Sequence, residues 1–199
     1  QFVEDCIQQN GVLDTLYQGF ALTWSNDLAD LAINGDGSTG TFLSINKGFR
    51  QLLIDEIGST NSYDTNGSTD WVDTVLPAVL LKLPDKYANK PGLEFQVCRT
   101  DYEAIAKLVY SRETAYGDLT LSSDNVLRYR GIPIVWYPYW PTGTIFLTDP
   151  KNLVMGIQRE FLAENDKDIE KRQYIFVMSG RTDFQIKNLG EIVIAYDIP

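Results

Sequence analysis

The stretch LAINGDGSTGTFLSIN, residues 31–46, separates a long helical pattern from everything that follows it. Before it, apolar residues recur every three or four positions from residue 13 to residue 32, which predicts an amphipathic helix over about residues 12–33. At 1.5 Å per residue, such a helix is about 33 Å long. Gly35 stands where a left-handed helix C-cap is expected, with the tolerant Asn34 before it. The stretch therefore predicts a helix end followed by a joint into the next unit.

The three glycines of this stretch also suggest a phosphate or metal site, but the surrounding residues exclude both. A P-loop requires a Lys after its last glycine and leads from a strand into a helix, whereas here a helix precedes the glycines and no such Lys follows. An EF-hand loop aligned on Asn34 requires Gly at position 39 and Glu at position 45, where this chain has Thr39 and Ile45. The joint remains the favoured interpretation.

Composition limits the classes of protein to which the chain can belong. Its 199 residues are 44% hydrophobic and 22% charged, values typical of a folded globular protein. The net charge of −10 argues against tight binding of nucleic acid.

No segment approaches the roughly 18 uninterrupted apolar residues of a membrane helix, so no membrane partner is expected. The sequence opens with Gln1 and without a leader pattern, so we expect it to begin inside a longer gene product.

The sequence predicts no catalytic, cofactor-binding or metal-binding residues. It contains no His, which excludes Ser-His-Asp and Cys-His catalysis, and Cys6 and Cys98 are two isolated thiols. Two groups of neighbouring carboxylates suggest acid-base chemistry, but such neighbours are expected by chance among 27 acidic residues. These groups are Asp64, Asp70 and Asp73, and Asp118 and Asp124.

The aromatic run WYPYWP, residues 136–141, leaves an alternative of a different class open. Trp136, Tyr137, Tyr139 and Trp140 would form a platform in a carbohydrate-binding or hydrolytic domain if their rings were exposed in one plane. Packing at the end of a strand is the favoured interpretation, because aromatic residues alternate here with prolines.

Helical patterns dominate the first half of the chain and strand patterns the second, which predicts an α+β protein. Helices are expected over residues 49–58, 70–83 and 101–110, and a strand over residues 93–98. Residues 59–70 and 111–125 are predicted to be polar loops. Strands are expected over residues 145–147, 153–157, 174–178, 184–186 and 192–196. The charged run at 159–172 is predicted to be a solvated turn, or alternatively a patch that pairs with a neighbouring subunit.

The order of these elements resembles the major capsid proteins of tailed phages with the Hong Kong 97-type fold. The resemblance is carried by five blocks in the same order: DLAINGDGSTGTFLSINKGF (30–49), LEFQVCRTDYEAIAKLVYSRETAYGD (93–118), YRGIPIVWYPYWP (129–141), IFLTDPKNLVMGIQREF (145–161) and YIFVMSGRTDFQIKNLGEIVIAYD (174–197). It implies a long spine helix, a mixed α/β axial domain and long antiparallel strands of a peripheral domain. The implied division assigns 1–41 to the peripheral domain, 42–148 to the axial domain and 149–199 to the peripheral domain again.

The resemblance implies a structural role and no enzymatic activity. The implied function is a subunit of an icosahedral phage head that self-assembles into hexamers and pentamers and encloses double-stranded DNA without reading its sequence. Scaffold and portal proteins are implied as further partners, the virion as the location and the host bacterial cytoplasm as the place of assembly. The family's N-terminal arm and extended loop precede the spine helix and have no counterpart in this sequence. An encapsulin-type nanocompartment shell is the alternative within the same fold.

The polar loop at 111–125 is the candidate contact between subunits at the capsomer axis. Its position in the family and its length and polarity between a helix and a strand support this hypothesis. The residues expected to meet their copies there are Arg112, Glu113, Tyr116 and Asp118.

Overall fold

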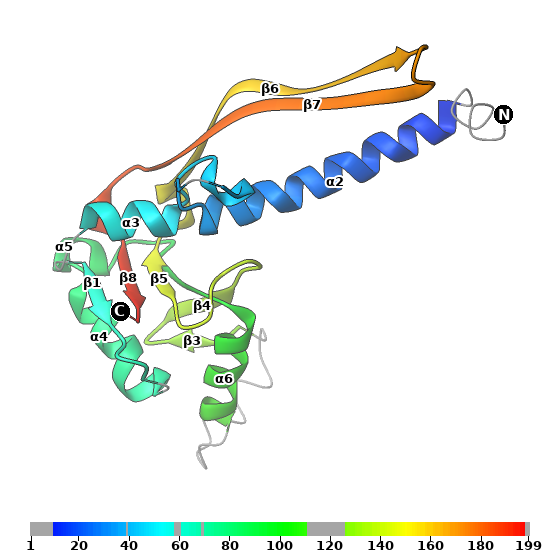
Figure 1. The fold of residues 1–199 in the computed structure, drawn as a ribbon. Helices are drawn as coiled ribbons and strands as arrows, with labels where there is room; N and C mark the ends of the chain where they lie inside the picture. Colours follow the sequence, from blue (N-terminus) through cyan, green and yellow to red (C-terminus); the bar gives the residue numbers. More distant parts are fainter. Residues whose placement is uncertain (1–9, 39, 58–60, 69, 111–125, 198–199) are drawn as a thin grey trace.

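The structure, a computed structural model, describes residues 10–38, 40–57, 61–68, 70–110 and 126–197. The chain forms a body built on a six-stranded sheet and an arm that extends from it (Figure 1). Helices and both parallel and antiparallel strand pairs occur together, so the predicted α+β class is confirmed. None of the described helices is both long and apolar enough to cross a membrane.

The elements follow one another along the chain with helices concentrated before residue 111. The helices are α2 (Asn10–Asn34), α3 (Phe49–Ile57), α4 (Leu76–Lys82), α5 (Asp85–Ala88) and α6 (Arg99–Tyr110), with short helical turns η1 (Phe42–Ser44), η2 (Trp71–Val75), η3 (Pro150–Asn152) and η4 (Leu189–Glu191). The strands are β1 (Ser62–Asp64), β2 (Glu94–Val97), β3 (Arg128–Tyr129), β4 (Ile132–Trp136), β5 (Ile145–Thr148), β6 (Leu153–Asp168), β7 (Gln173–Ile186) and β8 (Val193–Tyr196).

The six-stranded sheet of the body has the strand order β1-β8-β5-β2-β4-β3. The pairs β1/β8 and β2/β4 are parallel, and the other pairs are antiparallel. Successive side chains of a strand point to opposite faces, so each face of this sheet buries its own set of residues. Phe95 and Val97 of β2 pack with α4 and α6 on one face, whereas Cys98, Phe146 and Ile194 pack toward α2 and α3 on the other.

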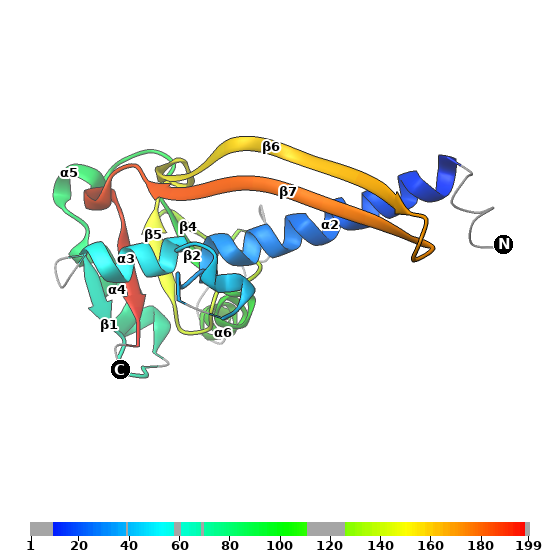
Figure 2. The same cartoon turned by 45° about the horizontal axis from the view of Figure 1, so that its top comes forward.

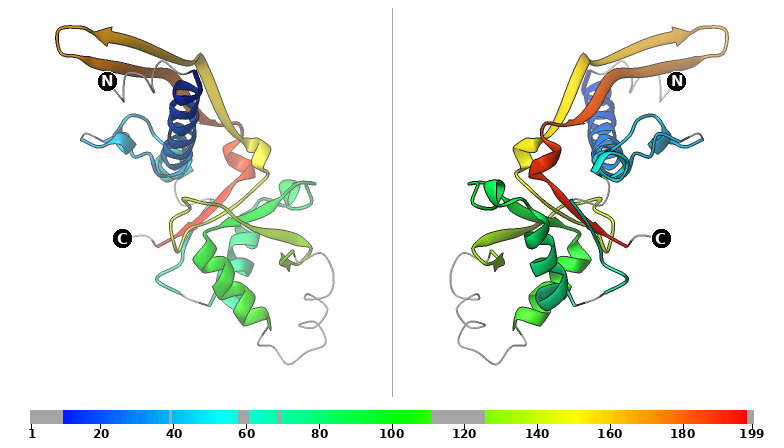
Figure 3. Two further views of the ribbon diagram at one scale, coloured as in Figure 1. Left: turned by 90° about the vertical axis from the view of Figure 1, so that its right-hand side faces the viewer. Right: turned by 90° about the vertical axis from the view of Figure 1, so that its left-hand side faces the viewer.

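The arm consists of α2 and the hairpin β6/β7, which run side by side away from the body (Figures 1 and 2). Viewed along the helix, the hairpin covers one side of α2 (Figure 3). The ring of Phe176 on β7 contacts Tyr17 and Phe20 on α2, with centroids 6.2 and 6.0 Å apart. At the base of the arm, Phe184 packs on Phe49 of α3, with the centroids 5.5 Å apart. Aromatic contacts therefore attach the hairpin both near its tip and at its base.

Several sequence-based expectations are confirmed and others are wrong. The helices at 12–33 and 49–58 and the strand at 93–98 correspond to α2, α3 and β2. The loop predicted at 59–70 contains the strand β1, which forms because its backbone pairs with β8. The charged run at 159–172 is not one turn: most of it belongs to β6, and the turn of the hairpin lies at residues 169–172.

The last strand differs from the expectation that all strands after residue 149 lie together. β6 and β7 form their own two-stranded sheet, but β8 inserts between β1 and β5 in the body. The residues of β8 are buried on both faces, which favours a central place in the larger sheet over a place in the solvated arm. Residues 149–199 are therefore shared between the arm and the body.

Candidate assembly surfaces

The joint between α2 and α3 is a close-packed loop that fixes the arm on the body. Gly35 and Gly48 lie against each other, and the Gly48 N–H donates to the Gly35 carbonyl at 2.8 Å. A Cβ atom built on Gly35 would lie 2.6 Å from the carbonyl oxygen of Leu31. Gly35 does not have the left-handed conformation expected of a C-cap, since its φ is not positive. A glycine is needed here because two backbone segments approach each other too closely for any side chain.

Polar side chains extend the joint to two other parts of the molecule. Asn34 Nδ2 donates to the carbonyl oxygen of Tyr139 at 2.8 Å, and Asn46 Nδ2 donates to Asp183 Oδ1 at 2.9 Å. Lys47 pairs with Asp55 at 2.7 Å, and its hydrogen bond holds the pKa of the Asp55 carboxyl below its usual value. The joint thereby binds α2, α3 and β7 into one unit.

The hairpin presents apolar side chains on both of its faces. Phe176 and Met178 point toward α2, so the residues that alternate with them face away from the helix. On that outer face Ile175 and Val177 are 40% and 48% exposed, and Leu162 is exposed on the same face of β6, opposite Ser179. Apolar residues on the solvent side of a two-stranded sheet are typical of a surface that contacts another protein. The outer face of the hairpin is one candidate assembly surface.

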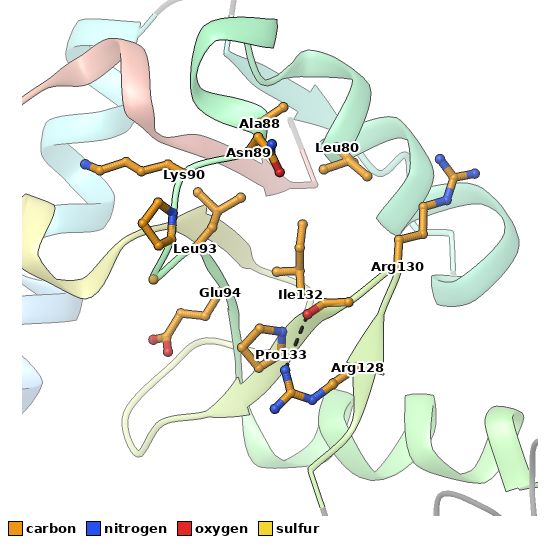
Figure 4. A pocket seen from close by; sticks show the side chains of 13 residues that line it. Leu80, Ala88, Asn89, Lys90, Leu93, Glu94, Arg128, Arg130, Ile132 and Pro133 are labelled. Carbon is orange, nitrogen blue, oxygen red and sulfur yellow. Dashed lines mark hydrogen bonds between the residues drawn. The ribbon is translucent and has the colours of Figure 1, made fainter.

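A second candidate is a groove of about 710 Å³ in the body, between the segment that leads into β2 and the hairpin β3/β4 (Figure 4). Its basic residues are Lys90, Arg128 and Arg130, and Glu94 is the acidic residue of its lining. Lys90 lies 2.5 Å from Glu191 and 3.8 Å from Asp149, so its charge is already balanced. Arg128 and Arg130 make no ion pair with any residue that the structure describes.

The aromatic run at 136–141 does not form a platform. Trp140 is only 8% exposed, and its ring centroid lies 4.9 Å from that of Phe146 within the core. The Tyr137 hydroxyl donates to Glu94 at 2.8 Å, and burial, with this hydrogen bond, raises the pKa of Tyr137 to about 12. Trp136 and Tyr139 are 46% and 41% exposed. Because two of the four rings pack inward, the predicted alternative of a sugar-binding platform is wrong.

The neighbouring carboxylates within the described residues serve the local backbone. Asp64 accepts from the N–H of Asn66, and Asp70 accepts from the N–H of Asp73 and the hydroxyl of Thr74 at the start of η2. Among the residues that the structure describes, no three His, Cys, Asp or Glu side chains come together as metal ligands would. Asp118 and Asp124 lie outside the described residues.

The residues expected at the capsomer axis, Arg112, Glu113, Tyr116 and Asp118, also lie outside the described part of the chain. The described residues next to them are the end of α6 at Tyr110 and the residues before β3. Sequence reasoning missed the basic groove, whose residues come from positions 80–94 and 128–133 and share no motif.

Comparison with known structures shows what kind of fold this is. A chain of the satellite phage P4 procapsid matches all of this chain with a TM-score of 0.73 at 15% identity, and this chain covers 67% of it. A chain of the capsid of an empty GTA particle matches 92% of this chain with a TM-score of 0.63, also at 15% identity, and 65% of it is covered. The chain has the Hong Kong 97-type capsid fold.

This capsid fold also occurs in shells of another kind. The holo-SrpI encapsulin complex from Synechococcus elongatus PCC 7942 matches 94% of this chain with a TM-score of 0.58 at 12% identity, and 65% of that chain is covered. The expected fold, with its spine helix α2 and long antiparallel strands β6 and β7, is confirmed.

A sequence relative supports the same conclusion. The protein named "Putative prophage capsid protein YqbE" of Bacillus subtilis (strain 168) is 25% identical over 197 residues, which cover 91% of this chain and 60% of the relative. The chain thus spans about three fifths of the length of this curated relative. No family model matches the sequence.

Proposed function

We propose that this chain is the wall-forming part of a phage major capsid subunit. In this role it self-assembles into hexamers and pentamers and encloses double-stranded DNA without reading its sequence. The observation that carries the proposal is the match of the whole chain to a chain of a phage procapsid, joined to a relative named as a prophage capsid protein. A shell subunit acts through its surfaces and needs no catalytic residues, in keeping with a sequence that has no His.

The charge of the chain supports a container for DNA. With 27 acidic and 17 basic residues, the wall is negative and repels the duplex, so that packaged DNA is held by enclosure and not by binding. The virion is then the location of the protein and the host cytoplasm the place of its assembly. Scaffold and portal proteins complete the list of proposed partners.

We propose that the arm and the body correspond to two domains with different positions in the capsomer. Residues 1–41 and the hairpin β6/β7 form the peripheral domain, residues 42–148 form the axial domain, and β8 rejoins the axial sheet. The axial domain directs the end of α6 and the following loop toward the capsomer axis. The chain spans about three fifths of the length of its sequence relative.

A charge-swap experiment on the axis loop tests this role. Reversing Glu113 and Asp118 to Lys in the full-length gene product should prevent capsomer formation while leaving the subunit folded, because like charges then meet around the axis. Native mass spectrometry reports the capsomers, and circular dichroism reports the fold. Normal shells after both swaps would refute the proposed place of this loop.

An encapsulin-type shell is the second candidate, favoured by the match to the SrpI complex. The contents of purified shells separate the two functions. Double-stranded DNA of defined length indicates a phage head, whereas a protein cargo without DNA indicates a nanocompartment. Glycan binding or hydrolysis, the function of a different class, is disfavoured by the burial of Trp140.

A further inference from the structure

The two ends of the six-stranded sheet carry opposite charges. The strand order places β1 at one edge of the sheet and β3 at the other. Arg128 of β3 and Arg130 of the β3/β4 turn line the groove at one end. The other end carries four aspartates on or beside β1, η2 and β8: Asp64, Asp70, Asp73 and Asp197.

The aspartates of the second end lie close together because β1 and β8 are parallel and end at the same level. Asp64 is level with Tyr196 in the strand register, and Asp197 Oδ1 accepts from the N–H of Gly67 at 3.1 Å. A turn in which the N–H of Ser68 donates to Thr65 O then leads to Asp70 and η2. We name these four aspartates the acidic end, and the groove with Arg128 and Arg130 the basic end.

The basic end has the properties of a docking groove for carboxylates. Both arginine side chains are exposed, Arg128 Nη1 donates to the carbonyl of Gly131 at 3.4 Å, and the Arg130 guanidinium lies 5.5 Å from the ring centroid of Tyr129. Arg130 adopts a left-handed conformation with φ of 49°, which is costly for a residue with a Cβ. Guanidinium groups bind carboxylates through two parallel hydrogen bonds, so exposed carboxylates are the chemistry that this groove fits.

We propose that the basic end of one copy docks on the acidic end of the next copy around a capsomer ring. The inference rests on the proposed function, and it assigns the polarity and the chemistry of the contact between neighbouring axial domains. A ring is closed by one patch of each subunit meeting a different patch of its neighbour, which requires complementary surfaces on two sides of the subunit. The edge strands β1 and β3 have only three and two residues, so they offer little free backbone for pairing with another copy, and side chains make most of the contact.

The partner is a second copy because the acidic end complements the groove in charge and belongs to the other edge of the same sheet. Packaged nucleic acid is the competing polyanion, but only the basic end would matter in that case. Charge reversals at the two ends therefore separate the two partners.

The experiment uses two variants of the full-length gene product, R128E/R130E and D64K/D73K. The control is K167E/K171E, at exposed sites near the turn of the hairpin β6/β7, which changes the net charge by the same amount as R128E/R130E. Rings are counted by native mass spectrometry and electron microscopy at about 50 mM and about 500 mM NaCl, since salt screens exposed charge pairs. Each of the first two variants alone should lose rings at least about tenfold, because like charges then face each other. The control should form rings as the wild type does.

Mixing the two variants gives the decisive result. Each interface then pairs an acidic surface with a basic one only if the two variants alternate around the ring. Strict alternation needs an even number of subunits, so the mixture should restore hexamers but not pentamers. Restored rings would also show that both variants fold. Unchanged rings in R128E/R130E alone would overturn the proposal, and so would a mixture that gives no rings or gives pentamers as well.

Two further outcomes distinguish the possible failures. If R128E/R130E keeps its rings but loses binding to a short labelled DNA duplex, the groove contacts nucleic acid and the copy-to-copy contact is wrong. If the wild-type protein forms no rings under any condition, the proposed function itself fails, and the docking proposal fails with it.

Discussion

Replacing Phe176 with Ala should release the hairpin from the spine helix without unfolding the body. A Phe side chain buries about 200 Å² when fully covered, so the half-buried Phe176 buries about 100 Å², worth about 2.5 kcal/mol. The contacts of its ring with Tyr17 and Phe20 contribute about 0.5 kcal/mol each beyond burial. The Cβ of Ala would still bury some apolar surface, and these two corrections to the free energy roughly cancel. The attachment of the hairpin should weaken by about 2 to 3 kcal/mol, or about 30- to 150-fold.

Hydrogen exchange measured by mass spectrometry tests this directly, because local detachment exposes the amides of one region only. Protection in β6 and β7 near Phe176 should fall by the same factor, while protection in β5 and β8 stays unchanged. Ile175→Ala is the matched control, because its side chain lies on the opposite face of β7 and should have little effect. Equal loss of protection in arm and body, or no loss in the hairpin, would refute the reasoning.

The remaining predictions concern Gly35 in the joint between α2 and α3, and Tyr137 after β4. Gly35→Ala should destabilise the chain by about 1 to 3 kcal/mol, because its Cβ would lie 2.6 Å from Leu31 O. Gly19→Ala, in open space on the same helix, should instead stabilise it by up to about 1 kcal/mol; thermal unfolding compares the two, and equal effects would contradict this account of the joint. The raised pKa of Tyr137 means that the folded state holds the phenol proton more tightly, so stability is lost as pH rises from about 10 through about 12. Urea titrations across this range should lack that step in Tyr137→Phe, and an identical pH profile would contradict the assignment.

Sequence patterns predicted those elements whose stability is local. The helices α2 and α3 have apolar residues at helical spacing, and β2 alternates strictly, so each could be identified without its neighbours.

Elements that depend on distant partners escaped the sequence patterns. β1 lies in a polar segment and is a strand only because Ser62, Tyr63 and Asp64 pair with β8 at the other end of the chain. The second half of β6 is rich in charges and has no apolar alternation, but its ladder with β7 keeps it extended. Gly35 was correctly singled out for the wrong reason, because the close approach of Gly48 cannot be read from sequence.

The candidate surfaces could not be predicted from sequence patterns either, because they also depend on residues that are distant in the chain. The exposed outer face of the hairpin and the basic groove are made from strand register and from segments that the fold brings together. A resemblance in the order of elements gave the fold and the proposed class of function, but not the chemistry of the contacts.

The central claim, that this chain builds the wall of a phage-type shell, is tested most directly by electron cryomicroscopy of the full-length gene product expressed alone. The account predicts closed shells or rings of five and six subunits, with the basic end of each axial domain against the acidic end of the next. Monodisperse single subunits under all assembly conditions would contradict it.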